Sequence, residues 1–141
     1  MSLSDVADIA VSGLLAQRVR MVVTASNIAN AQTTRTPEGG PYQRRDPVFE
    51  AKPLREGFGS ELDRALTAVE VPRVVTDPRP GAMHYDPGHP DADADGYVRM
   101  PNVDLVEEMT NMMSAQRSFE ANLLALHKAR EMSDAALRIG R

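Results

Sequence analysis

The chain has 141 residues, of which 42% are hydrophobic and 26% charged, and its formal net charge is −4. That length fits one ordinary domain or two small units sharing a core, and the acidic balance argues against nucleic-acid binding, which needs a clustered basic face. There is no cysteine, which excludes disulfides and thiolate zinc sites, and eight Met beside three Phe, three Tyr and no Trp favour helix-to-helix seams as the core.

The N-terminal segment is predicted to be a helix from residue 3 to about 31, because it lacks proline and holds a single glycine, Gly13. Asp5 and Asp8 stand where a secretory signal would be basic, so we expect no cleaved signal peptide. No apolar run approaches the ~20 residues that a membrane span requires. Seven-residue spacing puts one apolar row on a single helix face, formed by Ala7, Leu14, Met21 and Ile28.

The middle of the chain, residues 33–101, holds all ten prolines and seven of the nine glycines. That density breaks helices and favours turns and edge strands. Two short strands are predicted, from Tyr42 to Phe49 and from Val69 to Val75. Residues 59–62 could open a brief helix, and residues 77–101 are expected to be extended and rich in turns.

The segment Asp91-Ala92-Asp93-Ala94-Asp95-Gly96 copies the opening of a calcium-binding EF-hand loop. The template needs a Glu at its twelfth position, where this chain has Asn102, and a helix where this chain has Pro90. We therefore interpret the segment as a solvated turn and expect no metal site, with a calcium-binding module as the alternative. His84 and His89 lack the close ligand spacing of a structural metal site.

The C-terminal segment is predicted to be a helix that follows Pro101, with Asn102 as its N-cap. It would be about 50–55 Å long, more than a domain of this size can cover, so part of its surface is expected to meet other chains. A stripe with alternating spacings of four and three runs along it, formed by Leu105, Met109, Met112, Gln116, Phe119, Leu123, Leu126, Arg130, Ser133 and Leu137.

The chain lacks the sequence patterns of nucleotide-binding loops and of serine hydrolases. We expect no enzyme activity, no catalytic residue and no cofactor. The predicted fold is mainly α. Residues 1–32 and 102–141 form a helical assembly domain, paired as a coiled-coil-like bundle, and residues 33–101 form a loop-rich, partly β middle domain.

Three blocks of the sequence follow the motifs of one known family. The first combines residues 14–17 with residues 25–34, Ala-Ser-Asn-Ile-Ala-Asn-Ala-Gln-Thr-Thr, and extends to Tyr42. The second comprises residues 85–90, Tyr-Asp-Pro-Gly-His-Pro, and residues 96–104, Gly-Tyr-Val-Arg-Met-Pro-Asn-Val-Asp. The third begins at Glu108-Met109 and continues through residues 114–122, Ser-Ala-Gln-Arg-Ser-Phe-Glu-Ala-Asn. Together they resemble the flagellar axial protein family, and in particular its basal-body rod subunits.

The resemblance implies a structural subunit of the proximal flagellar rod, exported by the flagellar type III apparatus without a cleaved signal. Subunits would polymerise in the periplasm through their terminal helices into a helical tube that transmits torque. The implied partners are further copies, other rod proteins, and the membrane-ring and rod-adaptor proteins of the basal body. A cytoplasmic coiled-coil adaptor is the alternative function.

In that mechanism the apolar row of the first helix would pack against the stripe of the last helix, with Leu14, Met21 and Ile28 facing Met112, Phe119 and Leu126. Both asparagines near the end of the first helix would bond backbone groups, and the loop from Arg35 to Tyr42 would reach a neighbouring subunit. The predicted assembly interface comprises Leu14, Met21, Asn27, Ile28, Asn30, Arg35, Tyr42, Met109, Met112, Phe119, Leu123 and Leu126.

Overall fold

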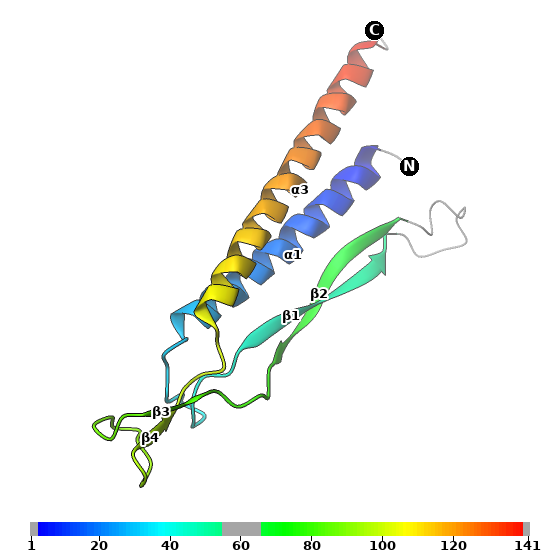
Figure 1. Ribbon diagram of the computed structural model, residues 1–141. Coiled ribbons are helices and arrows are strands. Elements are labelled where there is room, and N and C mark those ends of the chain that lie inside the picture. Colours follow the sequence, from blue (N-terminus) through cyan, green and yellow to red (C-terminus); the bar gives the residue numbers. More distant parts are fainter. Residues whose placement is uncertain (1–2, 55–65, 140–141) are drawn as a thin grey trace.

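The computed structural model describes residues 3–54 and 66–139. Its elements, in chain order, are α1 (Leu3–Ala29), β1 (Arg45–Pro53), β2 (Thr67–Thr76), β3 (Met83–Tyr85), β4 (Tyr97–Arg99) and α3 (Leu105–Ile139) (Figure 1). This confirms two long terminal helices around a small β-containing middle. The brief helix expected at residues 59–62 lies outside the described residues.

The two helices run antiparallel and side by side, and α3 continues past the N-terminal end of α1 (Figure 1). The difference in length explains this overhang, because α1 has 27 residues and α3 has 35. The last turns of α3 therefore have no helical neighbour among the described residues. Neither helix, over the part of the chain that the structure describes, is long and apolar enough to cross a membrane.

The N-cap of α3 is Asp104, so the prediction of Asn102 as the cap is wrong. The Asp104 carboxylate accepts hydrogen bonds from the backbone N–H groups of Val106 and Glu107, at 2.8 and 3.1 Å. Asn102 lies outside the helix, and its side chain holds two other segments together. Its Oδ1 accepts from the backbone N–H of Arg44 at 2.7 Å, and its Nδ2 donates to the backbone oxygen of Asp77 at 3.1 Å.

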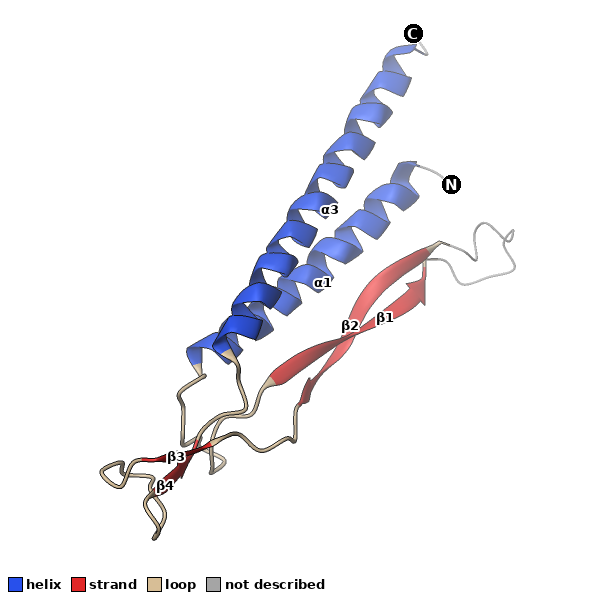
Figure 2. Ribbon diagram, viewed as in Figure 1, coloured by secondary structure: helices blue, strands red, loops and turns tan. Residues whose placement is uncertain are grey.

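β1 and β2 form an antiparallel pair that runs from Arg45↔Thr76 to Pro53↔Thr67. Both predicted strands are confirmed with different boundaries: the first begins and ends later in the sequence than predicted, and the second extends further at both ends. Because the sheet has two strands, each is an edge, which explains how both tolerate a proline. The pair packs along α1, where the backbone N–H of Val69 donates to the Ser12 hydroxyl at 3.1 Å. α1 thus lies between α3 and the β1–β2 pair (Figure 2).

β3 and β4 form a second, short antiparallel pair beyond the ends of the helices, in the segment expected to be extended (Figure 2). The rings of Tyr85 and Tyr97 pack edge to face, with their centroids 5.2 Å apart. Gly81 precedes β3 at a close backbone approach, because a Cβ there would lie 1.9 Å from the backbone oxygen of Met100. A glycine is therefore required at this position.

Candidate functional site: a buried polar junction beside exposed apolar helix faces

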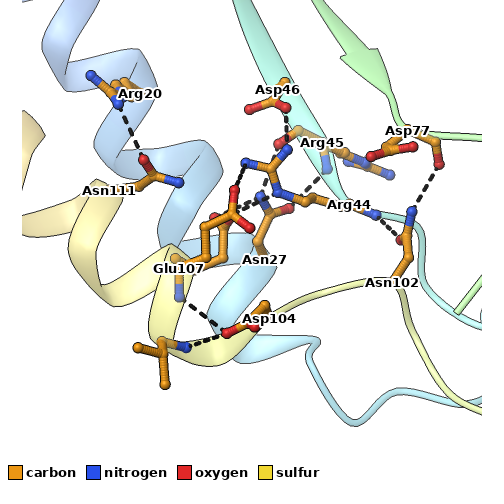
Figure 3. A network of polar contacts seen from close by, with 12 residues as sticks. Arg20, Asn27, Arg44, Arg45, Asp46, Asp77, Asn102, Asp104, Glu107 and Asn111 are labelled. Atoms are coloured by element: carbon orange, nitrogen blue, oxygen red, sulfur yellow. Dashed lines mark hydrogen bonds and ion pairs between the residues drawn. The ribbon is translucent and has the colours of Figure 1, made fainter. Parts of the chain in front are cut away.

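Asn27 (Figure 3) and its hydrogen-bond partner Glu108 form the centre of a buried polar cluster where the C-terminal end of α1, the start of β1 and the start of α3 meet. Each of the two residues is 1% exposed. Buried polar groups of this kind are costly unless every hydrogen-bonding atom has a partner. We call this cluster the polar junction and define it as Asn27, Tyr42, Arg44, Arg45, Asn102 and Glu108.

The side-chain amide of Asn27 uses its full hydrogen-bonding capacity, two donated and two accepted bonds. Its Nδ2 donates to the backbone oxygen of Arg45 at 2.8 Å and to Oε2 of Glu108 at 2.9 Å. Its Oδ1 accepts from the Tyr42 hydroxyl at 2.9 Å and from the backbone N–H of Arg45 at 3.0 Å. One side chain on α1 therefore binds the backbone of β1 and the first turn of α3 together.

Arg44 neutralises the buried carboxylate of Glu108, with Nε donating to Oε1 at 2.7 Å. The same guanidinium is paired with Asp46 and lies 3.6 Å from Oε1 of Glu107 (Figure 3). Burial lowers the pKa of Arg44, but the hydrogen bond and charge of Glu108 outweigh it, so the pKa is raised. A buried carboxylate held by a charged donor and an amide satisfies the conditions for a stable buried ion pair.

The polar junction extends to the loop after β2 through Asp77. The backbone N–H of Asp77 donates to the backbone oxygen of Arg44 at 2.8 Å. Hydrogen bonds from the Arg79 side chain, and then from its backbone N–H, lower the pKa of the Asp77 carboxyl to about 2. These contacts fix the start of β1 against the segment that leads to β3.

The expectation that both asparagines near the end of α1 bond backbone groups is confirmed. Asn27 bonds the backbone of Arg45, and Asn30 Nδ2 donates to the backbone oxygen of Ser26 at 2.9 Å. The same Ser26 oxygen also accepts from the backbone N–H of Asn30 at 3.1 Å, so the Asn30 side chain adds a second hydrogen bond at the end of α1. Ile28, on the predicted apolar row, is half-buried.

The loop from Arg35 to Tyr42 has one end buried and the other exposed. Tyr42 is buried in the polar junction, whereas the side chain of Arg35 is 79% exposed. Asp91 holds this loop, because its carboxylate accepts from the Thr34 hydroxyl at 2.8 Å and lies 3.7 Å from the Arg35 guanidinium. Arg35 and residues 37–40 of this loop are exposed and therefore open to a neighbouring chain, whereas Tyr42 is not.

The segment that resembles the start of a calcium loop is a hydrogen-bonded turn. Oδ1 of Asp93 accepts from the backbone N–H groups of Asp95 and Tyr97, at 3.0 and 2.8 Å. Gly96 has a φ of 82°, which favours glycine. Within residues 3–54 and 66–139, no three His, Asp or Glu side chains gather as a metal site would require.

Large apolar side chains lie on the outer faces of both helices. On α1, Leu15 is 58% and Val22 is 62% exposed, and on α3, Met109 and Met113 are each 55% exposed. Among the other predicted assembly residues, Leu123 is exposed and Leu126 is buried. Those that are half-buried are Leu14, Met21, Met112 and Phe119.

The less exposed rows of α3 only partly follow the predicted stripe. Residues 112, 119, 126 and 133 are buried or half-buried, as the stripe requires, but residues 109, 116, 123 and 130 are exposed. The second row is instead displaced by one residue. It consists of Glu108, Ala115, Asn122 and Ala129, which are small or polar and so gave no apolar signal.

Sequence reasoning missed Glu108, Arg44 and Asn102 as functional residues. Nothing in the local pattern distinguishes Glu108 from its exposed neighbour Glu107, because acidic residues are common in a first helical turn. A usable signal was the position of Glu108 at the start of the third motif block. Position within a motif could not reveal its partners, which come from two other segments.

Comparison with known proteins identifies relatives along nearly the whole chain. Residues 8–35 match the family described as flagella basal body rod protein, and residues 94–139 match the flagellar basal body rod FlgEFG protein C-terminal family. The chain is 42% identical over 142 residues to the flagellar basal-body rod protein FlgC of Yersinia enterocolitica, covering 99% of each chain. It is 41% identical over 149 residues to that of Borreliella burgdorferi, covering 99% of this chain and 98% of the relative. The protein of the same name from Bacillus subtilis is 39% identical over 145 residues, covering 95% of each.

Proposed function

The chain belongs to the family of the flagellar basal-body rod protein FlgC, and from this premise we propose that it polymerises through the outer faces of α1 and α3 into a torque-transmitting helical tube. As a member of this family it is a structural subunit of the flagellar rod and not an enzyme. The proposal concerns how the subunit assembles, that is, which of its faces meet its neighbours.

The exposure of large apolar side chains along both helices carries the proposal. On α1 the outer face holds Val11, Leu15 and Val22, and on α3 it holds Val106, Met113 and Leu124, all of them exposed. Rows of exposed large apolar side chains along two helices favour burial of these faces against another chain. Two different faces on one subunit make heterologous contacts, which generate helical filaments when the rotation does not close.

In this assembly, residues 1–32 and 102–141 act as the assembly domain, and residues 33–101 act as a middle domain held by the polar junction. The repeat of seven on both helices favours coiled-coil-like pairing. Asn27 and Tyr42 would contribute by positioning, because their side chains are buried within the chain. Arg35 would contact a neighbour directly through its exposed guanidinium. The flexible Met109 and Met113 side chains suit contacts with several non-identical rod proteins.

The partners we propose are further copies of this chain, other rod proteins, and the membrane-ring and rod-adaptor proteins at the base. Delivery would use the flagellar type III export apparatus, without a cleaved signal peptide, followed by assembly in the periplasm. The small core supports this route, since alanines make up half of the eight buried hydrophobic residues in the described part of the chain, and a core of small side chains contributes less to stability. Family membership favours the rod over the cytoplasmic adaptor.

Charge substitution on the outer face of α1 tests the proposal. Leu15→Glu combined with Val22→Glu alters two exposed side chains, so the isolated chain should fold as before. We expect this variant to be missing from purified basal bodies and its cells to be non-motile. Gln43→Ala, at an exposed residue of the middle domain, should assemble normally. A double variant that enters basal bodies and supports swimming would refute the proposed interface.

A further inference from the structure

One row of the seam between α1 and α3 is formed by small and polar side chains, Glu108, Ala115, Asn122 and Ala129 of α3. Three contacts define the seam along its length. The Asn122 side chain occupies the space beside Gly13, where a Cβ would lie 2.7 Å from Nδ2 of Asn122. Nη2 of Arg20 donates to Oδ1 of Asn111 at 3.3 Å. At the far end of the seam, Asn27 donates to Glu108.

The contacts at the two ends belong to one antiparallel register. Gly13 lies fourteen residues before Asn27, and Asn122 lies fourteen residues after Glu108. Fourteen residues are two repeats of seven, so both pairs fall on the same row of each helix. We call Asn27–Glu108 and Gly13–Asn122 the two register contacts.

The small side chains between and beyond these contacts do little to fix the register. Ala10, Ala115 and Ala129 are all buried. Alanines one repeat apart have the same small side chain, so the opposite helix can pack against either. A slide by one repeat of seven, about 10 Å along the axis, would therefore keep much of the alanine packing. A slide in either direction along the axis would, however, separate Asn27 from Glu108 and Asn122 from Gly13. Each slid state would break the hydrogen bond between the buried Asn27 amide and the buried Glu108 carboxylate, and this loss disfavours the slid states.

We propose that the two register contacts determine the alignment of α1 on α3, and through it the relative position of the two outer faces presented to neighbouring subunits. This rests on the proposed function for its biological consequence. A neighbour that contacts both Leu15 on α1 and Met113 on α3 can do so in one register only. A single polar residue in an otherwise apolar or small seam commonly specifies register in this way.

The decisive variant combines Glu108→Ala with Asn122→Ala. It leaves alanine at every position of the α3 row 108, 115, 122 and 129, while the bonds of Asn27 to Tyr42 and Arg45 remain. Nitroxide labels at Asp8→Cys and Gln116→Cys report the register in the full-length chain, which has no native cysteine. Both positions are exposed, and they lie far enough apart along the helix axis that a slide changes their separation directly.

In the labelled chain with both register contacts intact, electron–electron distance measurements should give one narrow distance. The double alanine variant should add a second population displaced by up to about 10 Å. A matched control, Arg117→Ala with Glu131→Ala, removes two exposed side chains at the same spacing of fourteen and should keep the single distance. The proposal is overturned by one unchanged distance in the double alanine variant, by the same broadening in the control, or by a broad distribution in the starting chain.

A separate arm distinguishes this proposal from the proposed function. The chain with Leu15→Glu and Val22→Glu should retain the single distance while being excluded from basal bodies. If that chain assembles, the proposed role of the outer faces is wrong. The proposal about the register contacts is tested by the distance measurement alone.

Discussion

The side-chain amide of Asn27 donates a hydrogen bond of 2.9 Å to the carboxylate of Glu108, and both side chains are 1% exposed. The two residues are 81 positions apart in the sequence. Each also bonds the chain at the start of β1, Asn27 through the backbone of Arg45 and Glu108 through the side chain of Arg44. The contact therefore attaches the middle of the chain to both terminal helices at once.

Removing the carboxylate of Glu108 should destabilise the fold markedly. In Glu108→Ala, the buried Arg44 guanidinium and the Asn27 amide lose a partner, and breaking a buried ion pair typically costs about 3–5 kcal/mol. Urea unfolding followed by circular dichroism measures the loss. The control Glu120→Ala removes an exposed carboxylate from the same helix and should change the free energy of unfolding by less than about 0.5 kcal/mol. Equal effects of the two substitutions would contradict the account.

Exchanging the amide and the carboxylate tests whether Asn27 and Glu108 interact directly. Asn27→Asp sets two carboxylates against each other, and Glu108→Gln weakens the pair with Arg44. In the double variant an amide again faces a carboxylate, with donor and acceptor exchanged. A double-mutant cycle should therefore give a favourable coupling free energy of at least about 1 kcal/mol. Strictly additive losses would mean that the two side chains do not stabilise each other.

Gly81→Ala should disrupt the approach of the β3 segment to the chain after β4. The added Cβ would lie 1.9 Å from the backbone oxygen of Met100, so the backbone has to move. We expect the Met100 N–H bond to Ala82 to lose protection from hydrogen exchange. Gly88→Ala is the matched control, because its Cβ has nothing closer than the Asp86 carboxylate at 3.5 Å. Unchanged protection in Gly81→Ala would show that the close approach is not required.

The Asp77 carboxyl should titrate with a pKa of about 2, below its ordinary value of 3.8, because Arg79 donates side-chain and backbone hydrogen bonds to its charged form. A carboxyl whose pKa is lowered by folding stabilises the folded state above pH 3.8, and this contribution is lost as the pH falls through about 2. Arg79→Gln keeps the backbone bond and removes the charge, so the pKa should rise towards 3.8. Carbon-detected NMR titration of the carboxyl measures the change. A pKa that is the same in both chains would rule out Arg79 as the cause.

The sequence was sufficient to predict the elements that depend on local pattern. The long segments without proline correctly predicted α1 and α3, and the apolar runs beside Pro47 and Pro72 correctly predicted the two longer strands, β1 and β2. The predicted N-cap failed because Asn102 and Asp104 are both good caps, and only the tertiary contacts of Asn102 decide between them.

The seam of α3 could be predicted only in part, for a physical reason. A search for apolar periodicity finds large side chains, and here many of them, such as Met109, face outwards. The row that faces inwards contains Glu108, Ala115 and Asn122, whose fit depends on Asn27 and Gly13 in a distant segment. Periodicity on one helix cannot reveal such complementarity between two helices.

Chemical accessibility of the outer face, compared between free and assembled subunits, tests the central claim most directly. Val22→Cys introduces the only thiol of the chain at a residue that is 62% exposed in the isolated subunit. In cells whose swimming shows that this variant assembles, a maleimide should label the free chain rapidly and intact purified basal bodies hardly at all. Labelling should return when the basal bodies are dissociated by denaturant. Equally rapid labelling of intact basal bodies would contradict burial of this α1 face in the rod.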